Sequence, residues 1–260
     1  MTSAEDRINH VISHACNDFN GEINDICVRN LLTGAGNRAG SLSILESYAH
    51  VMGIYSWFVT RDLASLRNWF FTMASMQLAK TAGMTAPERR HSLSLFSASI
   101  SAFSNCANTY RAMAKVLKSL YSESDNVPLL RILSIQAGFI LEGNVSAARD
   151  ALDSAIAGPP AQTDPLSPDI SVFVNLHHGS DSDLQSSIVR LCELGDKRSE
   201  MENGYTEGLV NTPATFYTKL CLMAGRNVEV RHPMIPDAWL TDDPKSKPVF
   251  RFPQLNDIVF

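Results

Sequence analysis

The chain has 260 residues, a formal net charge of −5 at pH 7 and a charged fraction of 19%. A chain of this length can bury a full core and is compatible with one large domain or two small ones. The acidic balance argues against non-specific nucleic-acid binding, because such binding needs a basic surface that releases the counterions of phosphate groups.

The N-terminal sequence and the cysteines indicate a compartment. MTSAEDRINH is polar and acidic, so it lacks the basic and then apolar layout of a secretory signal. The longest apolar stretch, residues 48–59, is too short to span a bilayer. Five cysteines are an odd count without Cys-x-x-Cys spacing, as expected for reduced thiols in a core. We therefore expect a cytoplasmic protein that binds neither membrane nor nucleic acid.

The first 40 residues predict a short helix, an apolar patch and a glycine-rich loop. Apolar residues recur at helical spacing within 4–18, and the apolar patch covers 23–32. The loop contains Gly34, Gly36 and Gly40 but lacks the Gly-Lys-Ser/Thr of a phosphate-binding loop. We interpret this loop as a connection.

Three long helices are predicted next. Apolar residues at helical spacing predict helices over 42–59 and 63–82, separated by a polar break. A third helix can run over 87–121, with a kink or division at the polar pair Ser104 and Asn105. Part of this segment is rich in serine and alternates partly with period two, so a strand pair is an alternative there.

Two helical hairpins follow, over 134–156 and 171–195, with turns at Gly143 and Gly179. Superposing the two glycines aligns three further pairs: Ser146 with Ser182, Arg149 with Gln185, and Leu152 with Ile188. This spacing favours stacked hairpins of the α-helical repeat type. A plain four-helix array, which repeats its pattern by necessity, is the alternative.

The last part of the chain changes character. A Pro-rich linker covers 158–168, and a helix within 205–224 is expected to begin at Pro213. The segment 226–260 contains five prolines, which exclude a regular helix, together with large apolar residues that need burial. We expect an extended strap across the helical body, with short β-like pieces at 228–230 and 249–252.

These elements predict one all-α domain over 1–260. It comprises an N-terminal helix and loop (1–40), a helical body (41–225) and the extended C-terminal strap (226–260). The body consists of antiparallel helical hairpins packed as a bundle or as a short solenoid-like array.

The histidines offer two candidate chemical sites. His10, His14 and Asp18 are spaced at i, i+4 and i+8, which could hold a metal, but the row lacks a fourth ligand and equally fits a solvated helix face. His177 and His178 lie at a helix end, where histidine is favourable against the dipole. Gly-x-Ser-x-Gly, His-Glu-x-x-His and paired-cysteine motifs are absent. We therefore expect no metal, no cofactor and no catalytic residues.

Acidic residues gather between 181 and 207. Such a region can be a solvated loop, or it can be an electrostatic docking face for a basic partner. On the second interpretation, the predicted partner-binding residues are Asp181, Asp183, Asp196, Glu200 and Glu202.

Three segments carry a resemblance to a known family. They are LRNWFFTMASMQLAKTAG, the turn GNVSAARDAL, and FYTKLCLMAGRNVEVRHPMIPDAWL, in which Val-x-Val precedes His-Pro-x-Ile-Pro and a Trp-Leu pair. Across residues 40–240 the chain resembles the all-helical immunity proteins that neutralise bacterial polymorphic toxins, in particular the immunity 49 family. The serine-rich middle departs from that pattern. The resemblance implies a stoichiometric inhibitor that occludes the active site of a cognate toxin, and not an enzyme.

The hypothesis from sequence is therefore an immunity protein that neutralises a cognate bacterial toxin in the cytoplasm. Two alternatives stay open. One is a helical-repeat scaffold that binds a peptide or protein in a concave groove. The other is a helical enzyme with a polar pocket around His177, His178 and Tyr205.

Overall fold

The structure is a computed structural model that describes residues 4–18, 21–82, 84–85, 88–89, 93–121, 129–157, 167–194, 205–242 and 247–259. Within these residues every regular element is a helix, and none is a strand. The predicted all-α fold is confirmed, and the β-like pieces predicted within the strap are extended segments without strand pairing.

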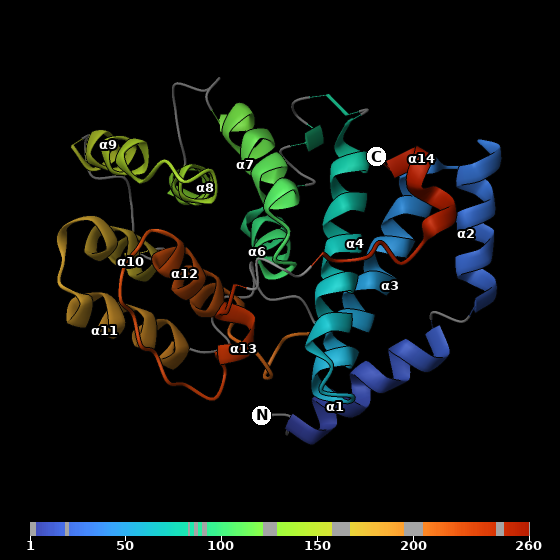
Figure 1. The fold of residues 1–260 in the computed structure, drawn as a ribbon, viewed down its shortest axis with the longest axis horizontal. Coiled ribbons are helices and arrows are strands. Elements are labelled where there is room, and N and C mark those ends of the chain that lie inside the picture. Colours follow the sequence, from blue (N-terminus) through green and yellow to red (C-terminus); the bar gives the residue numbers. More distant parts are fainter. Residues whose placement is uncertain are drawn as a thin grey trace.

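The N-terminal part is a layer of helices around one long antiparallel pair. Its elements are α1 (Ala4–Ser13), the π-helical turn η1 (His14–Asp18), α2 (Gly21–Thr33), α3 (Arg38–Phe58) and α4 (Leu63–Ala82). Helices α3 and α4 pack along their length, and α2 covers the outer side of α3 (Figure 1).

Local capping sets the bounds of this pair. Asn37 Oδ1 accepts a hydrogen bond from Gly40 N at 3.0 Å, so α3 begins several residues before the predicted start. The chain reverses at Arg61, whose φ is +56°. Asp62 Oδ1 then accepts from Ser65 N at 2.9 Å and opens α4, which begins and ends as predicted.

The predicted third helix is two helices, α6 (Leu95–Phe103) and α7 (Ala107–Tyr121). Asn105 lies between them with a φ of +59°, which confirms the predicted division. The strand-pair alternative is wrong. The serines of α6 are accommodated because their hydroxyls donate back to carbonyls three residues earlier, for example Ser101 to Ala98 at 2.7 Å.

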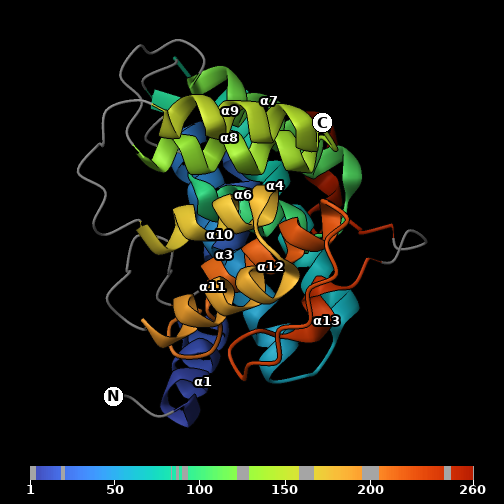
Figure 2. The same ribbon diagram turned by 90° about the vertical axis from the view of Figure 1, so that its left-hand side faces the viewer.

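Two hairpins follow: α8 (Leu129–Leu141) with α9 (Val145–Ile156), and α10 (Ser167–His178) with α11 (Asp181–Glu193). They stack one above the other, through contacts of α10 with α8 and α9 (Figure 2). The N-cap residues of their second helices, Asn144 and Ser180, each follow directly after the turn glycine of their hairpin. Leu152 and Ile188, aligned by that offset, are both fully buried. The repeat-like alignment therefore holds for caps and core positions.

Helix α12 (Thr212–Met223) fills the space among α6, α8 and α11. Asn211 caps it and Pro213 lies in its first turn, as predicted. Every residue from 212 to 221 is buried. The strap crosses α4 (Figure 1) and is not extended throughout as predicted. It contains the short helix α13 (Asp237–Leu240), the 3-10 turn η4 (Pro253–Leu255) and the short helix α14 (Asn256–Val259), none of which has a proline after its first residue.

Candidate functional site

The turn between α10 and α11 is held by a capping box. Ser180 Oγ accepts from Asp183 N at 3.1 Å, while Asp183 Oδ2 accepts from Ser180 N at 3.2 Å and from Ser180 Oγ at 2.6 Å. The Ser180 hydroxyl and amide hold the pKa of Asp183 below its usual range, so this exposed carboxylate stays charged.

Asp181 is fixed by an arginine from another part of the chain. Arg226 Nε donates to Asp181 Oδ1 at 2.8 Å, and the same guanidinium donates to the carbonyls of Gly179 at 2.9 Å and of Leu176. The carboxylate side chain keeps 46% of its accessible surface. Arg226 follows α12, so one side chain joins the end of α10, the start of α11 and the buried helix.

A third carboxylate adjoins this turn. Asp153 on α9 lies 2.8 Å from His178 Nε2 through its Oδ1, and its side chain is 47% exposed. We call Asp153, Asp181 and Asp183 the acidic turn. The sequence did not predict Asp153 as part of this site, because Asp153 lies in the neighbouring hairpin. The repeat spacing was the sequence feature that indicated that the two hairpins stack. The predicted interface residues Asp196, Glu200 and Glu202 lie outside the described residues.

The polar trio predicted for an enzyme pocket is divided between two places. His177 Nε2 lies 2.9 Å from Gln136 Oε1, and Gln136 Nε2 donates to the Ala148 carbonyl at 2.7 Å. Burial lowers the pKa of His177 to about 4. His177 thus joins α10 to the first hairpin, whereas the ring of Tyr205 packs against histidines from α1, η1 and α3.

The N-terminal histidines form a ring cluster. His10 and His14 have ring centroids 4.3 Å apart, and His14 is 5.3 Å from the Tyr205 ring. Across the described part of the chain, no three His, Cys, Asp or Glu side chains are grouped so that they could hold a metal ion. The Asp18 side chain lies outside that part.

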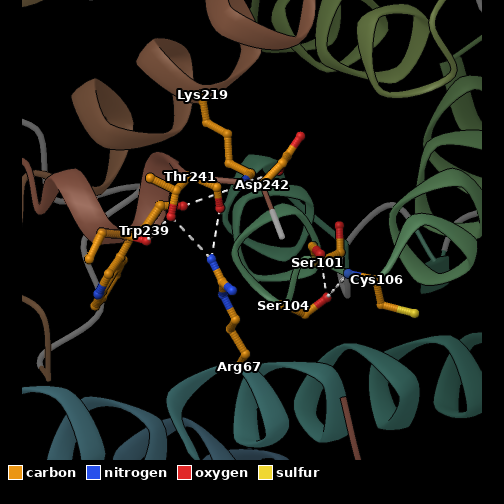
Figure 3. A network of polar contacts seen from close by, with 9 residues as sticks. Arg67, Ser101, Ser104, Cys106, Lys219, Trp239, Thr241 and Asp242 are labelled. Carbon is orange, nitrogen blue, oxygen red and sulfur yellow. Dashed lines mark hydrogen bonds and ion pairs between the residues drawn. The ribbon is translucent and has the colours of Figure 1, made fainter. Parts of the chain in front are cut away.

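A partly buried polar network joins the strap to the body (Figure 3). Arg67 of α4 donates to the Thr241 carbonyl at 2.7 Å, and Lys219 of α12 donates to the Trp239 carbonyl at 3.2 Å and to Asp242 Oδ1 at 3.0 Å. Lys219 is 1% exposed, and its burial lowers its pKa. A single lysine inside the apolar run FYTKLCLM was the available sequence signal for a buried cation.

A partly open apolar cavity of about 280 Å³ lies between α4, α7 and α14. Its lining includes Phe71 and Leu78 from α4, Cys106 and Ala112 from the α7 side, and Val259. Ser75, Asn108 and Thr109 also line the cavity, whose exposed surface is largely apolar.

Comparison with family models, with curated proteins and with solved structures finds no match to this chain. The resemblance to toxin-immunity proteins therefore stays a prediction. Of the helices that the structure describes, none has both the length and the apolar character needed to cross a membrane.

Proposed function

We propose that this protein is a stoichiometric inhibitor of the immunity type, which binds a cognate bacterial toxin and occludes its active site. The observation that carries the proposal is the acidic turn. Its three carboxylates are exposed or half-exposed, and each is held by a hydrogen bond or ion pair within the chain.

Fixed carboxylates suit a preformed docking surface. Side chains that are already ordered lose little conformational entropy on binding, so more of their interaction energy is retained in the complex. Complementary charge also accelerates the encounter with a basic partner. A basic substrate cleft, as in an enzyme that acts on nucleic acid or another polyanion, is the toxin surface that this turn would complement.

The two alternatives receive less support. A repeat scaffold needs an open groove among its hairpins, but α12 fills the space enclosed by α6, α8 and α11. A pocket enzyme needs convergent polar groups, but His177 serves a buried link to Gln136 and His178 pairs with Asp153.

The test starts with the immobilised chain and a lysate of the source bacterium. A captured polypeptide that forms a one-to-one complex is then expressed in a sensitive bacterial host, with and without the chain. The proposal expects growth arrest by the polypeptide alone and rescue by the chain. The proposal fails if the captured polypeptide is harmless, or if the chain does not rescue growth.

A further inference from the structure

Residues 247–252 of the strap cross α4 without regular secondary structure, and side chains of that helix accept hydrogen bonds from their backbone amides. The Val249 amide donates to Asn68 Oδ1 at 2.7 Å, and the Arg251 amide donates to Thr72 Oγ1 at 2.9 Å. The Thr72 hydroxyl donates to the Asn68 carbonyl, which leaves its lone pairs available to the strap. The Thr72 acceptor is thus oriented before the strap binds.

The spacing of these contacts follows from the geometry of the two elements. Residues four apart in a helix rise by about 6 Å along the axis. Alternate residues of an extended chain are about 6.6 Å apart and direct their amides to the same side. Asn68 and Thr72 therefore match the amides of Val249 and Arg251. The matching pairs end there. The next alternate residue of the strap is Pro253, which has no amide hydrogen, and the next helix residue four positions on is Met76, which has no strong acceptor.

The side chains of the alternate strap residues, Phe250 and Phe252, are aromatic anchors on α4. Phe250 and Phe252 are each 7% exposed and pack in a small core with residues of α2, α3 and α4, which adjoins the main core of the body through Tyr48 and Trp69. Trp69 packs edge-on against Phe252, with centroids 6.1 Å apart, and the guanidinium of Arg251 lies 5.4 Å from the Trp69 ring centroid. Arg251 also donates to Ser65 Oγ at 2.9 Å. Helix α4 thus contacts each side chain of the aromatic-basic-aromatic sequence Phe250-Arg251-Phe252.

We propose that this stripe of α4, with the apolar bed beside it, is a binding site for an extended aromatic-basic-aromatic peptide, occupied in cis by residues 247–252. The amide acceptors select an extended backbone, the bed takes the two aromatic side chains, and Trp69 with Ser65 takes the cation. Because Phe250 and Phe252 pack in the small core whereas α12 lies in the main core, residues 247–252 dissociate while α12 and the main core stay folded. A partner carrying the same pattern binds by replacing the strap.

The first test measures binding of a labelled peptide with the sequence of residues 247–259 to the full-length chain. The variant Phe250→Ser with Phe252→Ser weakens the strap as a competitor. The strap is a tethered competitor and acts at a millimolar effective concentration. For a peptide that binds the open site with a Kd of about 10 μM, removing this competitor tightens the observed binding about 100-fold. Adding Asn68→Ala and Thr72→Val to the variant weakens peptide binding by about 10-fold. Asn9→Ala on α1 is the matched control and leaves it unchanged.

Two results overturn the proposal. One is a folded variant that binds the peptide no more tightly than the parent chain, and the other is a variant whose peptide binding does not change when Asn68 and Thr72 are replaced.

A second test, amide hydrogen exchange on the parent chain, is independent of how well the variants fold. We expect the Arg251 amide to exchange with a lower opening free energy than the amides of α12. Equal protection of both would show that the strap opens only by global unfolding and would equally overturn it.

Discussion

Lys219 Nζ lies 3.0 Å from Asp242 Oδ1, and this ion pair joins the buried helix α12 to the strap. The two partners differ in environment, since the lysine side chain is 1% exposed and the aspartate 60%. The lysine has therefore lost its hydration and relies on the strap for its counter-charge. The strap contributes to the stability of the body through this pair.

Replacing Asp242 with alanine is expected to destabilise the protein by about 1.5–3 kcal/mol, the usual cost of losing a hydrogen bond to a charged group. Urea denaturation measures this change. Asp150→Ala removes an exposed carboxylate from α9 and serves as the control, with an expected change within about 0.5 kcal/mol. Equal stability of the two variants would show that Lys219 does not depend on Asp242.

His50 makes stability depend on pH. It is 1% exposed, and neither ring nitrogen has a hydrogen-bond partner among the described residues. Burial lowers its pKa from 6.5 to about 3. Between these two values the unfolded chain takes up a proton that the folded chain excludes, so stability is lost as the pH falls from 6.5 towards 3.

The variant His50→Phe keeps a ring against Phe70, Phe96 and Tyr205 and removes the titration. We expect the acid loss of stability to become shallower by up to about 1.4 kcal/mol per pH unit. At neutral pH the variant should be as stable as the parent chain or more so, since two unpaired buried nitrogens are gone. Denaturation series from pH 4 to 7, at about half-unit steps, measure both effects. An unchanged acid slope would contradict the assignment to His50.

Gly53 allows close contact between α3 and α4. A Cβ at this position would lie 2.6 Å from Phe70 Cε1, and Phe70 is fully buried against Phe103 and Trp239. Gly53→Ala is therefore expected to destabilise by about 1–3 kcal/mol through overpacking. Ser47→Ala, on the exposed face of α3, is the control and should be neutral or slightly stabilising. Thermal melts of both decide the point, and a neutral Gly53→Ala would mean that Phe70 relaxes freely.

The sequence predicted those helices whose signals are local. Helix α4 and the start of α12 follow from apolar spacing, a polar break and Pro213, all readable within a few residues. The predictions that failed depended on finer or more distant information. The α3 start required the Asn37 cap, which a loop rich in glycine obscured.

The candidate sites were less predictable, because their geometry joins distant segments. Arg226 contacts Asp181 across 45 residues, and Val249 contacts Asn68 across 181. Neither pairing leaves a periodic signal in a single sequence, since it is fixed by how the hairpins and the strap pack. Asp181 and Asp183 were found by composition, but the function of Arg226 and Ser180 in fixing them required the fold.

The proposed inhibitor is tested most directly by the association rate between the chain and its captured toxin, measured over a range of salt concentrations. The key variant carries Asp181→Asn and Asp183→Asn, which remove two charges and keep acceptors for Arg226 and Ser180. Asp25→Asn on α2, at the other end of the molecule (Figure 1), removes a distant exposed charge as the control.

We expect the double variant to associate at least about 10-fold more slowly at low salt and to lose much of the salt dependence, while the control behaves as the parent chain. Equal rates and equal salt dependence for all three proteins, at unchanged stability, would contradict a docking surface at the acidic turn.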